Sequence, residues 1–188
     1  MPDWQEILSR EGPAVWRTAY RILGNRADAD ECFQEAFLAA LEVSRRERVE
    51  HWRALLQRLA TARAVDRLRE RVRRRSREQP ADMNALCDAE SQPTPDAEDA
   101  EFSERLRVAI ARIPRKQAQV FSLHCLDDWS YQEIAGHMGI SINAVGVLLH
   151  RGRKHLRRLL GVPSGVSQVA GRDPTADPGP TNPRREPS

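Results

Sequence analysis

Residues 131–154, YQEIAGHMGISINAVGVLLHRGRK, determine how the C-terminal half of this chain folds. They have the pattern of two helices joined by a tight turn. Gly139 stands at the turn, where the backbone must adopt the left-handed conformation and a side chain would clash. Ser130 and Glu133 form a capping-box signature before the first helix, and Ser141 is suited to cap the second. We therefore predict a helix-turn-helix, with a plain helical hairpin as the alternative.

The second helix of this element has a predicted inner face and a predicted DNA-facing side. Spacings of four, three and four predict an inner face of Val145, Leu149, Gly152 and Leu156. Because such a helix enters the major groove with its N-terminal end foremost, Asn143 is the best candidate for base contact, and Ser141 is a further candidate DNA-binding residue. An amide pairs with adenine through two hydrogen bonds, although Asn143 could instead cap the turn. The candidate phosphate-binding residues are His150, Arg151, Arg153 and Lys154.

The middle of that helix is poor in charge. We expect Gly146, Val147 and Leu148 on its exposed face, where a helix that binds DNA tightly by itself would carry basic residues. Gly146 in a helix interior also costs about 1 kcal/mol relative to alanine. We therefore expect this element to bind DNA only weakly by itself and to need a further binding contact elsewhere.

Charge is strongly segregated along the 188 residues. The formal net charge is only +3, but arginine clusters at 53–77 and 151–158, and no Lys or Arg occurs between 78 and 104. Two basic blocks separated by an acidic one indicate a polyanionic partner, with solvated helix faces as the alternative. Since 40% of residues are hydrophobic and 30% charged, the cores must be small.

Apolar spacing predicts an all-α fold of two small helical domains. Helical stripes cover 15–23, 32–41 and 52–72, with Pro13 in a first turn, Gly24 as a C-cap and Asp28 as an N-cap. The predicted units are a helical domain at 1–78, an acidic linker at 79–100, a helix-turn-helix domain at 101–161 and a disordered tail at 162–188.

Several classes of protein are disfavoured. Cys32, Cys87 and Cys125 form no CxxC pair, so neither zinc nor a disulfide framework is expected, and we predict no cofactor. No nucleophile–base pair or phosphate loop points to an enzyme. No signal peptide and no apolar run near the roughly 18 residues of a membrane span is found, so we expect a cytoplasmic protein.

Three segments of the chain resemble the bacterial RNA polymerase sigma factors of the small extracytoplasmic-function type. Residues 24–42, GNRADADECFQEAFLAALE, are similar to the second conserved region of the family. Residues 52–74, WRALLQRLATARAVDRLRERVRR, resemble the promoter-melting helix that follows it. Residues 106–156 resemble the fourth region with its helix-turn-helix, and the order and spacing of all three also match.

The resemblance implies a role for each segment. It implies docking on the clamp helices of the largest polymerase subunit by Asp30, Glu31, Gln34 and Glu35, where ordinary helix solubility is the alternative. It implies a grip on the melted promoter strand by Trp52, Arg58, Arg63, Arg67, Arg71 and Arg74, although Trp52 has the spacing of a core residue. It implies that the second domain reads the upstream promoter element and meets the polymerase flap. An anti-sigma factor is left open as a further partner.

The chain departs from the family pattern at four positions, and these keep two rival functions open. Leu55 replaces a tryptophan, Ala62 replaces an asparagine, and Gly146 and Leu148 stand where Lys and Arg are usual. The rivals are a stand-alone helix-turn-helix regulator and a degenerate sigma-like protein that binds polymerase without initiating transcription.

Overall fold

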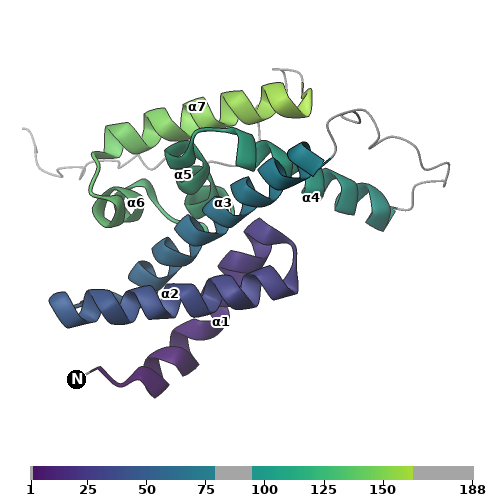
Figure 1. Cartoon of the computed structure of the whole chain (residues 1–188). Coiled ribbons are helices and arrows are strands. Elements are labelled where there is room, and N and C mark those ends of the chain that lie inside the picture. The colour runs from purple at the N-terminus through teal and green to yellow at the C-terminus, as the bar shows by residue number, and fades with distance from the viewer. Residues whose placement is uncertain (1, 79–94, 163–188) are drawn as a thin grey trace, which may run out of the picture.

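The computed structural model describes residues 2–78 and 95–162, and all regular secondary structure in these ranges is helical, which confirms the all-α prediction (Figure 1). The helices are α1 Trp4–Leu23, α2 Arg26–Arg46, α3 Trp52–Glu78, α4 Pro95–Arg112, α5 Arg115–Cys125, α6 Tyr131–Met138 and α7 Ile142–Leu160. Most of the predicted linker and tail lies outside the described residues. Helix α4 nevertheless begins at Pro95, inside the predicted linker of 79–100.

Helix α1 starts earlier than the sequence pattern suggested. The Asp3 carboxylate accepts hydrogen bonds from the backbone N–H groups of Gln5 and Glu6 at 3.0 and 3.1 Å and so caps the helix. Pro13 consequently lies inside α1 and not in a first turn, so that prediction is wrong. The C-terminal prediction is confirmed, because Gly24 has φ 65° and its N–H donates to the Tyr20 carbonyl.

The N-cap of α2 is Asn25 and not Asp28. Asn25 has the extended backbone of a cap, and its side-chain oxygen accepts from the Asp28 N–H at 3.1 Å. Asparagine and aspartate are both good caps, so the sequence alone did not distinguish the two positions. The Asp28 carboxylate instead accepts a hydrogen bond from Arg71 of α3 at 3.2 Å.

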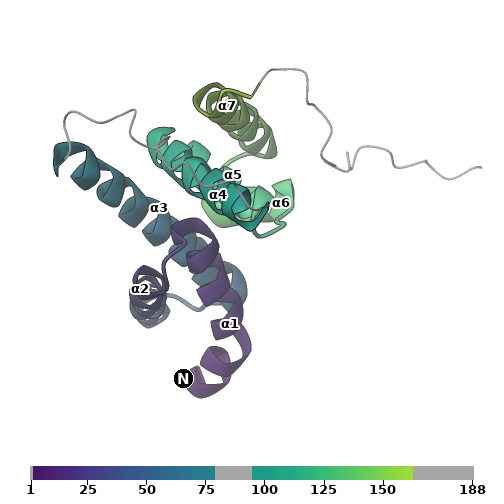
Figure 2. The same cartoon turned by 90° about the vertical axis from the view of Figure 1, so that its right-hand side faces the viewer.

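The long helix α3 lies between the two halves of the protein. In Figure 1, α1 and α2 lie below it and α5, α6 and α7 above it, whereas α4 crosses its C-terminal end; Figure 2 shows α4–α7 grouped together away from α2. One core cluster is made by the first three helices and includes Val15, Ala36 and Leu56. A second cluster joins both halves, because Leu23 and Leu68 are buried together with residues of α4, α5 and α7. The halves therefore share a hydrophobic core.

Polar contacts reinforce this association of the halves. Arg115 at the start of α5 donates two hydrogen bonds, 2.7 and 2.5 Å long, to the Asp66 carboxylate of α3. Arg69 of α3 donates to the Ile113 carbonyl at 2.6 Å. The Thr18 hydroxyl of α1 donates to the carboxylate of Asp127, in the loop before α6, at 2.9 Å. The two sequence-defined domains are thus packed into one body.

The helix-turn-helix forms from α6 and α7 as predicted. Ser130 and Glu133 make a complete capping box, and the Ser141 hydroxyl accepts from the Ala144 N–H at 3.2 Å. Gly139 has φ 63°, the left-handed value that the turn requires. The predicted inner face is confirmed, since Val145, Leu149, Gly152 and Leu156 are all buried. A third core cluster holds this element against α5 through Val120 and Leu123.

Candidate nucleic-acid interface

The outer face of α7 brings together most of the predicted DNA-contacting residues. Asn143, His150, Arg151 and Lys154 are all exposed. At 100° per residue they fall within one side of the helix, opposite the buried stripe centred on Leu149. Because Asn143 lies in the first turn and His150, Arg151 and Lys154 lie two to three turns later, the amide enters a groove first, which agrees with a helix that enters by its N-terminal end.

Two of the predicted DNA contacts are engaged elsewhere. The Ser141 hydroxyl is occupied as the N-cap, so its side chain already has a structural role. Arg153 is half-buried and its guanidinium donates to the Cys125 sulfur of α5 at 3.7 Å, away from the outer face. The structure therefore does not group Arg153 with Arg151 and Lys154.

The uncharged middle of α7 is smaller than the sequence suggested. Leu148 is half-buried against the core cluster of the helix-turn-helix, and Gly146 is partly covered by Tyr131. The expectation that both lie on the exposed face is wrong, because 100° steps place Leu148 beside the buried stripe. Only Val147 of the three is well exposed, at 48%.

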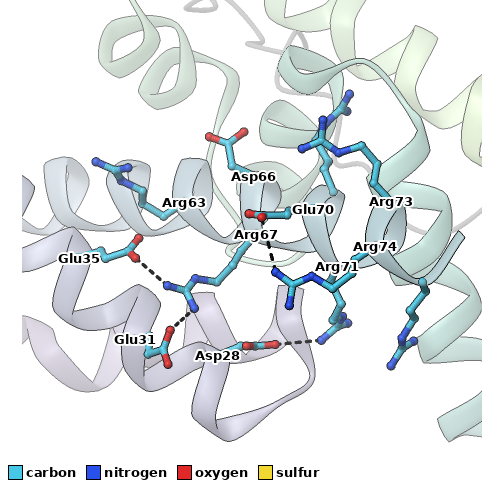
Figure 3. Close-up of a pocket in the computed structure, with 12 residues that line it drawn as sticks. Asp28, Glu31, Glu35, Arg63, Asp66, Arg67, Glu70, Arg71, Arg73 and Arg74 are labelled. Atoms are coloured by element: carbon cyan, nitrogen blue, oxygen red, sulfur yellow. Dashed lines mark hydrogen bonds and ion pairs between the residues drawn. The ribbon is translucent and has the colours of Figure 1, made fainter. Parts of the chain in front are cut away.

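Two arginines of α3, Arg67 and Arg71, point to the acidic side of α2, whereas Arg63 and Arg73 point away from it (Figure 3). Arg67 bonds to both Glu31 and Glu35, its bond to Glu35 being 2.6 Å long, and its own side chain is only 24% exposed. Arg71 donates to Asp28 and to the Leu23 carbonyl. The hydrogen bond to Glu31 and that to Glu35 raise the pKa of Arg67 further, so the cation is fixed. Two of the predicted strand-gripping arginines are thus neutralised within the protein.

The remaining predicted strand-binding residues differ in exposure. Arg63 and Arg74 are exposed, and Arg74 makes only a long ion pair with Glu70 at 3.7 Å. Arg58 is half-buried near the helix-turn-helix. Trp52 packs edge-on against Trp4 with ring centroids 5.0 Å apart and joins the N-terminal core cluster. This packing favours the structural role for Trp52 over that of an exposed platform for bases.

The predicted docking residues of α2 split into two groups. Glu31 and Glu35 turn toward Arg67, whereas Asp30 and Gln34 lie on the outer face. The Trp16 indole N–H donates to Asp30 at 2.6 Å and so fixes that carboxylate. Leu38, one turn beyond Gln34, is 63% exposed. The sequence analysis missed it, although its spacing of four from Gln34 would have placed it on this face.

Within 2–78 and 95–162, no cluster of three or more His, Cys, Asp or Glu is arranged to hold a metal ion. Cys32 is buried and its thiol donates to the Ala60 carbonyl at 3.4 Å, and burial raises its pKa to about 12. Cys125 is a free exposed thiol, and Cys87 falls outside the described residues. None of the described helices has the length and apolar character to cross a membrane.

The described residues thus form an all-α protein with a helix-turn-helix, an element whose second helix lies in the major groove in DNA-binding proteins. The family model "Sigma-70 region 2" matches residues 7–74, and the model "Sigma-70, region 4" matches residues 103–156. The chain belongs to the sigma-70 family of RNA polymerase sigma factors, and within it to the extracytoplasmic-function type.

Individual relatives agree with this assignment. The chain is 28% identical over 160 residues to the ECF RNA polymerase sigma factor SigE of Mycolicibacterium smegmatis, covering 85% of this chain and 62% of that protein. It is 29% identical over 164 residues to SigW of Bacillus subtilis, covering 78% of this chain and 82% of that protein. Its fold resembles the sigma factor RpoE of Bartonella quintana, solved with the anti-sigma factor NepR, with a TM-score of 0.53 and 18% identity over 86% of this chain and 99% of that one.

Proposed function

We propose that this protein is a dissociable specificity subunit of bacterial RNA polymerase. It binds the core enzyme, directs it to promoters and takes part in opening them, and it catalyses no reaction itself. The observation that carries the proposal is the presence, in one chain and in family order, of both conserved regions at 7–74 and 103–156. A stand-alone regulator has no need of the first region.

The upstream promoter element is assigned to the outer face of α7. Asn143 supplies an amide for an adenine edge, and Arg151 and Lys154 supply cations for the phosphates on either side. Ser141 contributes by capping the helix, which fixes the direction of its N-terminal end. This division of work explains why few charges are needed at the centre of the helix.

The core enzyme is assigned to the outer face of α2. Asp30, Gln34 and Leu38 form a continuous exposed strip that offers a carboxylate, an amide and an apolar side chain. Glu31 and Glu35 flank this strip and join it on release from Arg67. Of the predicted strand-binding arginines of α3, Arg63 and Arg74 are exposed in the free protein, so we assign these two to the melted strand.

The setting of this activity follows from its partners. Because core polymerase and promoter DNA lie in the bacterial cytoplasm, we place the protein there. An anti-sigma factor is a further class of partner, and the complex of the Bartonella sigma factor with its anti-sigma protein supports this proposal by analogy of fold.

Transcription in vitro tests the proposal. The purified full chain is added to bacterial core polymerase and fragmented DNA of the source genome, and the 5′ ends of the transcripts are mapped by sequencing. We expect discrete start sites that share two spaced upstream elements and that disappear when the protein is omitted. Asp30→Lys combined with Gln34→Lys should reduce co-elution with core at least tenfold, while Arg17→Glu on α1 serves as the control for a change of surface charge.

The alternatives give different results in the same assay. Co-elution with core in the absence of any start site would replace the proposal by a degenerate sigma-like protein. Neither starts nor co-elution, together with tight binding to duplex DNA, would replace it by a stand-alone regulator.

A further inference from the structure

The N-terminal half of the outer face of α7 is apolar apart from Asn143. Ile142 and Val147 are each 48% exposed, and no Lys or Arg lies on this face before Arg151. We infer that Val147 is a specificity residue that packs on the 5-methyl group of a thymine in the upstream element. The inference rests on the proposed function and adds a base and a contact to it.

Val147 lies at the centre of the predicted DNA-contacting residues. Asn143 precedes it by four residues, His150 and Arg151 follow it by three and four, and Lys154 follows by seven. Residues at these spacings are neighbours on one helix face. When the surrounding side chains reach bases and phosphates, Val147 is enclosed between α7 and the floor of the major groove and loses its water.

The chemistry of the groove then identifies what Val147 meets. A valine side chain offers no hydrogen bond, so a base edge made only of donors and acceptors would lose water without compensation. The thymine 5-methyl is the apolar group that the major groove displays, and small apolar side chains contact it. A phosphate would require a cation at this position, and the chain has none there.

Gly146 beside Val147 supports a close approach of DNA. A Cβ added at Gly146 would meet only the Tyr131 ring, at an ordinary contact distance of 3.7 Å, so packing inside the protein does not require glycine. Glycine in the interior of a helix is unfavourable by itself. Its low profile leaves room for the wall of the groove next to Val147.

Helix geometry restricts where the thymine lies. Four residues of α-helix advance about 6 Å, and successive base pairs are about 3.4 Å apart. The thymine is therefore expected within about two base-pair steps of the adenine read by Asn143. This requirement makes the inference testable at a single base.

The experiment combines a protein variant with the removal of one methyl group from DNA. A promoter mapped with the wild-type chain and core polymerase is rebuilt with deoxyuridine in place of each thymine of the upstream element in turn. Initial transcription rates are measured for the wild type, for Val147→Ala and for Leu159→Ala, an exposed apolar residue at the far end of α7. Val147→Ala raises helix propensity, so a loss of rate is not a loss of fold.

For the wild type we expect one thymine whose replacement by deoxyuridine lowers the initial rate about fourfold. This factor corresponds to the free energy of burying one methyl group, about 0.8 kcal/mol. Val147→Ala should be slower on the thymine promoter and insensitive to deoxyuridine at that position, while Leu159→Ala keeps the wild-type profile. Equal rates on every deoxyuridine promoter, or the same sensitive position in Val147→Ala, would overturn the inference while leaving the proposed function intact. Failure of the wild type to initiate anywhere would overturn the proposed function and this inference with it.

Discussion

Arg67 of α3 donates a hydrogen bond to the Glu35 carboxylate of α2 over 2.6 Å, and the same guanidinium also bonds Glu31. This arrangement joins a residue predicted to bind the melted DNA strand to two residues predicted to dock on polymerase. In the free protein the charge of Arg67 is therefore paired with those of Glu31 and Glu35. Under the proposed function, binding of polymerase or of the melted strand through these residues requires that this cluster rearrange.

The Arg67 cluster should contribute measurably to stability. Arg67→Ala removes two charge-assisted hydrogen bonds and leaves Glu31 and Glu35 facing each other, so we expect a loss of about 1 kcal/mol in the free energy of unfolding by urea. Arg74→Ala is the control, since Arg74 is exposed and makes only a long pair with Glu70. Equal stability of the two variants would contradict a structural role for the cluster.

The Asp66–Arg115 pair should hold the halves together. Asp66→Arg places two guanidinium groups opposite each other at the junction of α3 and α5, so we expect a larger radius of gyration in small-angle X-ray scattering. Glu70→Arg, one helical turn along α3, is the control because Glu70 contacts only Arg74 among the ion pairs of the described residues. An unchanged radius for Asp66→Arg would show that the shared apolar core is sufficient.

The capping box of α6 should depend on an ionised Glu133. Hydrogen bonds from the Ser130 backbone and hydroxyl lower the pKa of Glu133 below 4.5. A lowered folded-state pKa means that the stabilisation is present above the unfolded value and is lost as the pH falls through the folded one. We expect Ser130→Ala to cost about 1 kcal/mol at pH 7, measured by thermal unfolding. Its deficit relative to wild type should shrink as the pH falls through the folded-state pKa of Glu133, and a constant deficit would contradict the ionic part of the cap.

His137 should make the protein less stable in mild acid. Burial lowers its pKa below 6.5, and the nearby His51 and Arg58 lower it further. The unfolded chain therefore binds more protons as the pH falls through 6.5, so the free energy of unfolding should decrease between pH 7.5 and 5.5. His137→Gln should flatten this decrease in urea titrations, whereas His150→Gln on the outer face of α7 serves as the matched control. Parallel curves for wild type and His137→Gln would exclude the effect.

Phosphate contacts should appear in the salt dependence of promoter binding. Arg151→Ala with Lys154→Ala should reduce the slope of log affinity against log salt by about 2 for the polymerase complex, at unchanged affinity for core. Arg153→Ala should leave the slope nearly unchanged, because Arg153 points to Cys125. A larger change of slope for Arg153→Ala than for the double variant would show that DNA binds on a different side of α7.

Local features of the fold were predictable from the sequence because short-range chemistry determines them. The turn at Gly139, the caps at Ser130 and Ser141 and the buried stripe of α7 all depend on residues within one or two helical turns. The half-buried position of Leu148 could have been predicted in the same way, since its angle around the helix axis places it beside the buried stripe. Asn25 and Asp28 were not separable, because either side chain is a good cap.

The long-range features depend on how the helices pack, and the sequence pattern did not reveal them. Nothing in the basic run of α3 distinguishes Arg67, which is paired across to α2, from the exposed Arg63. The sharing of a core by the two halves likewise depends on Leu68 and Ile110 meeting in space from helices separated by an acidic segment. The position of Arg153 against Cys125 is of the same kind.

The shared core has a consequence for how binding constants should be read. Any partner that requires the halves apart must first expose Leu68, Ile110 and Ile113, so only the separated fraction of molecules is competent. The apparent dissociation constant then exceeds the intrinsic one by the reciprocal of that fraction. A substitution buried between α3 and α5 can thus change the apparent affinity for polymerase although the residue does not contact polymerase, because it changes the fraction of molecules that are competent to bind.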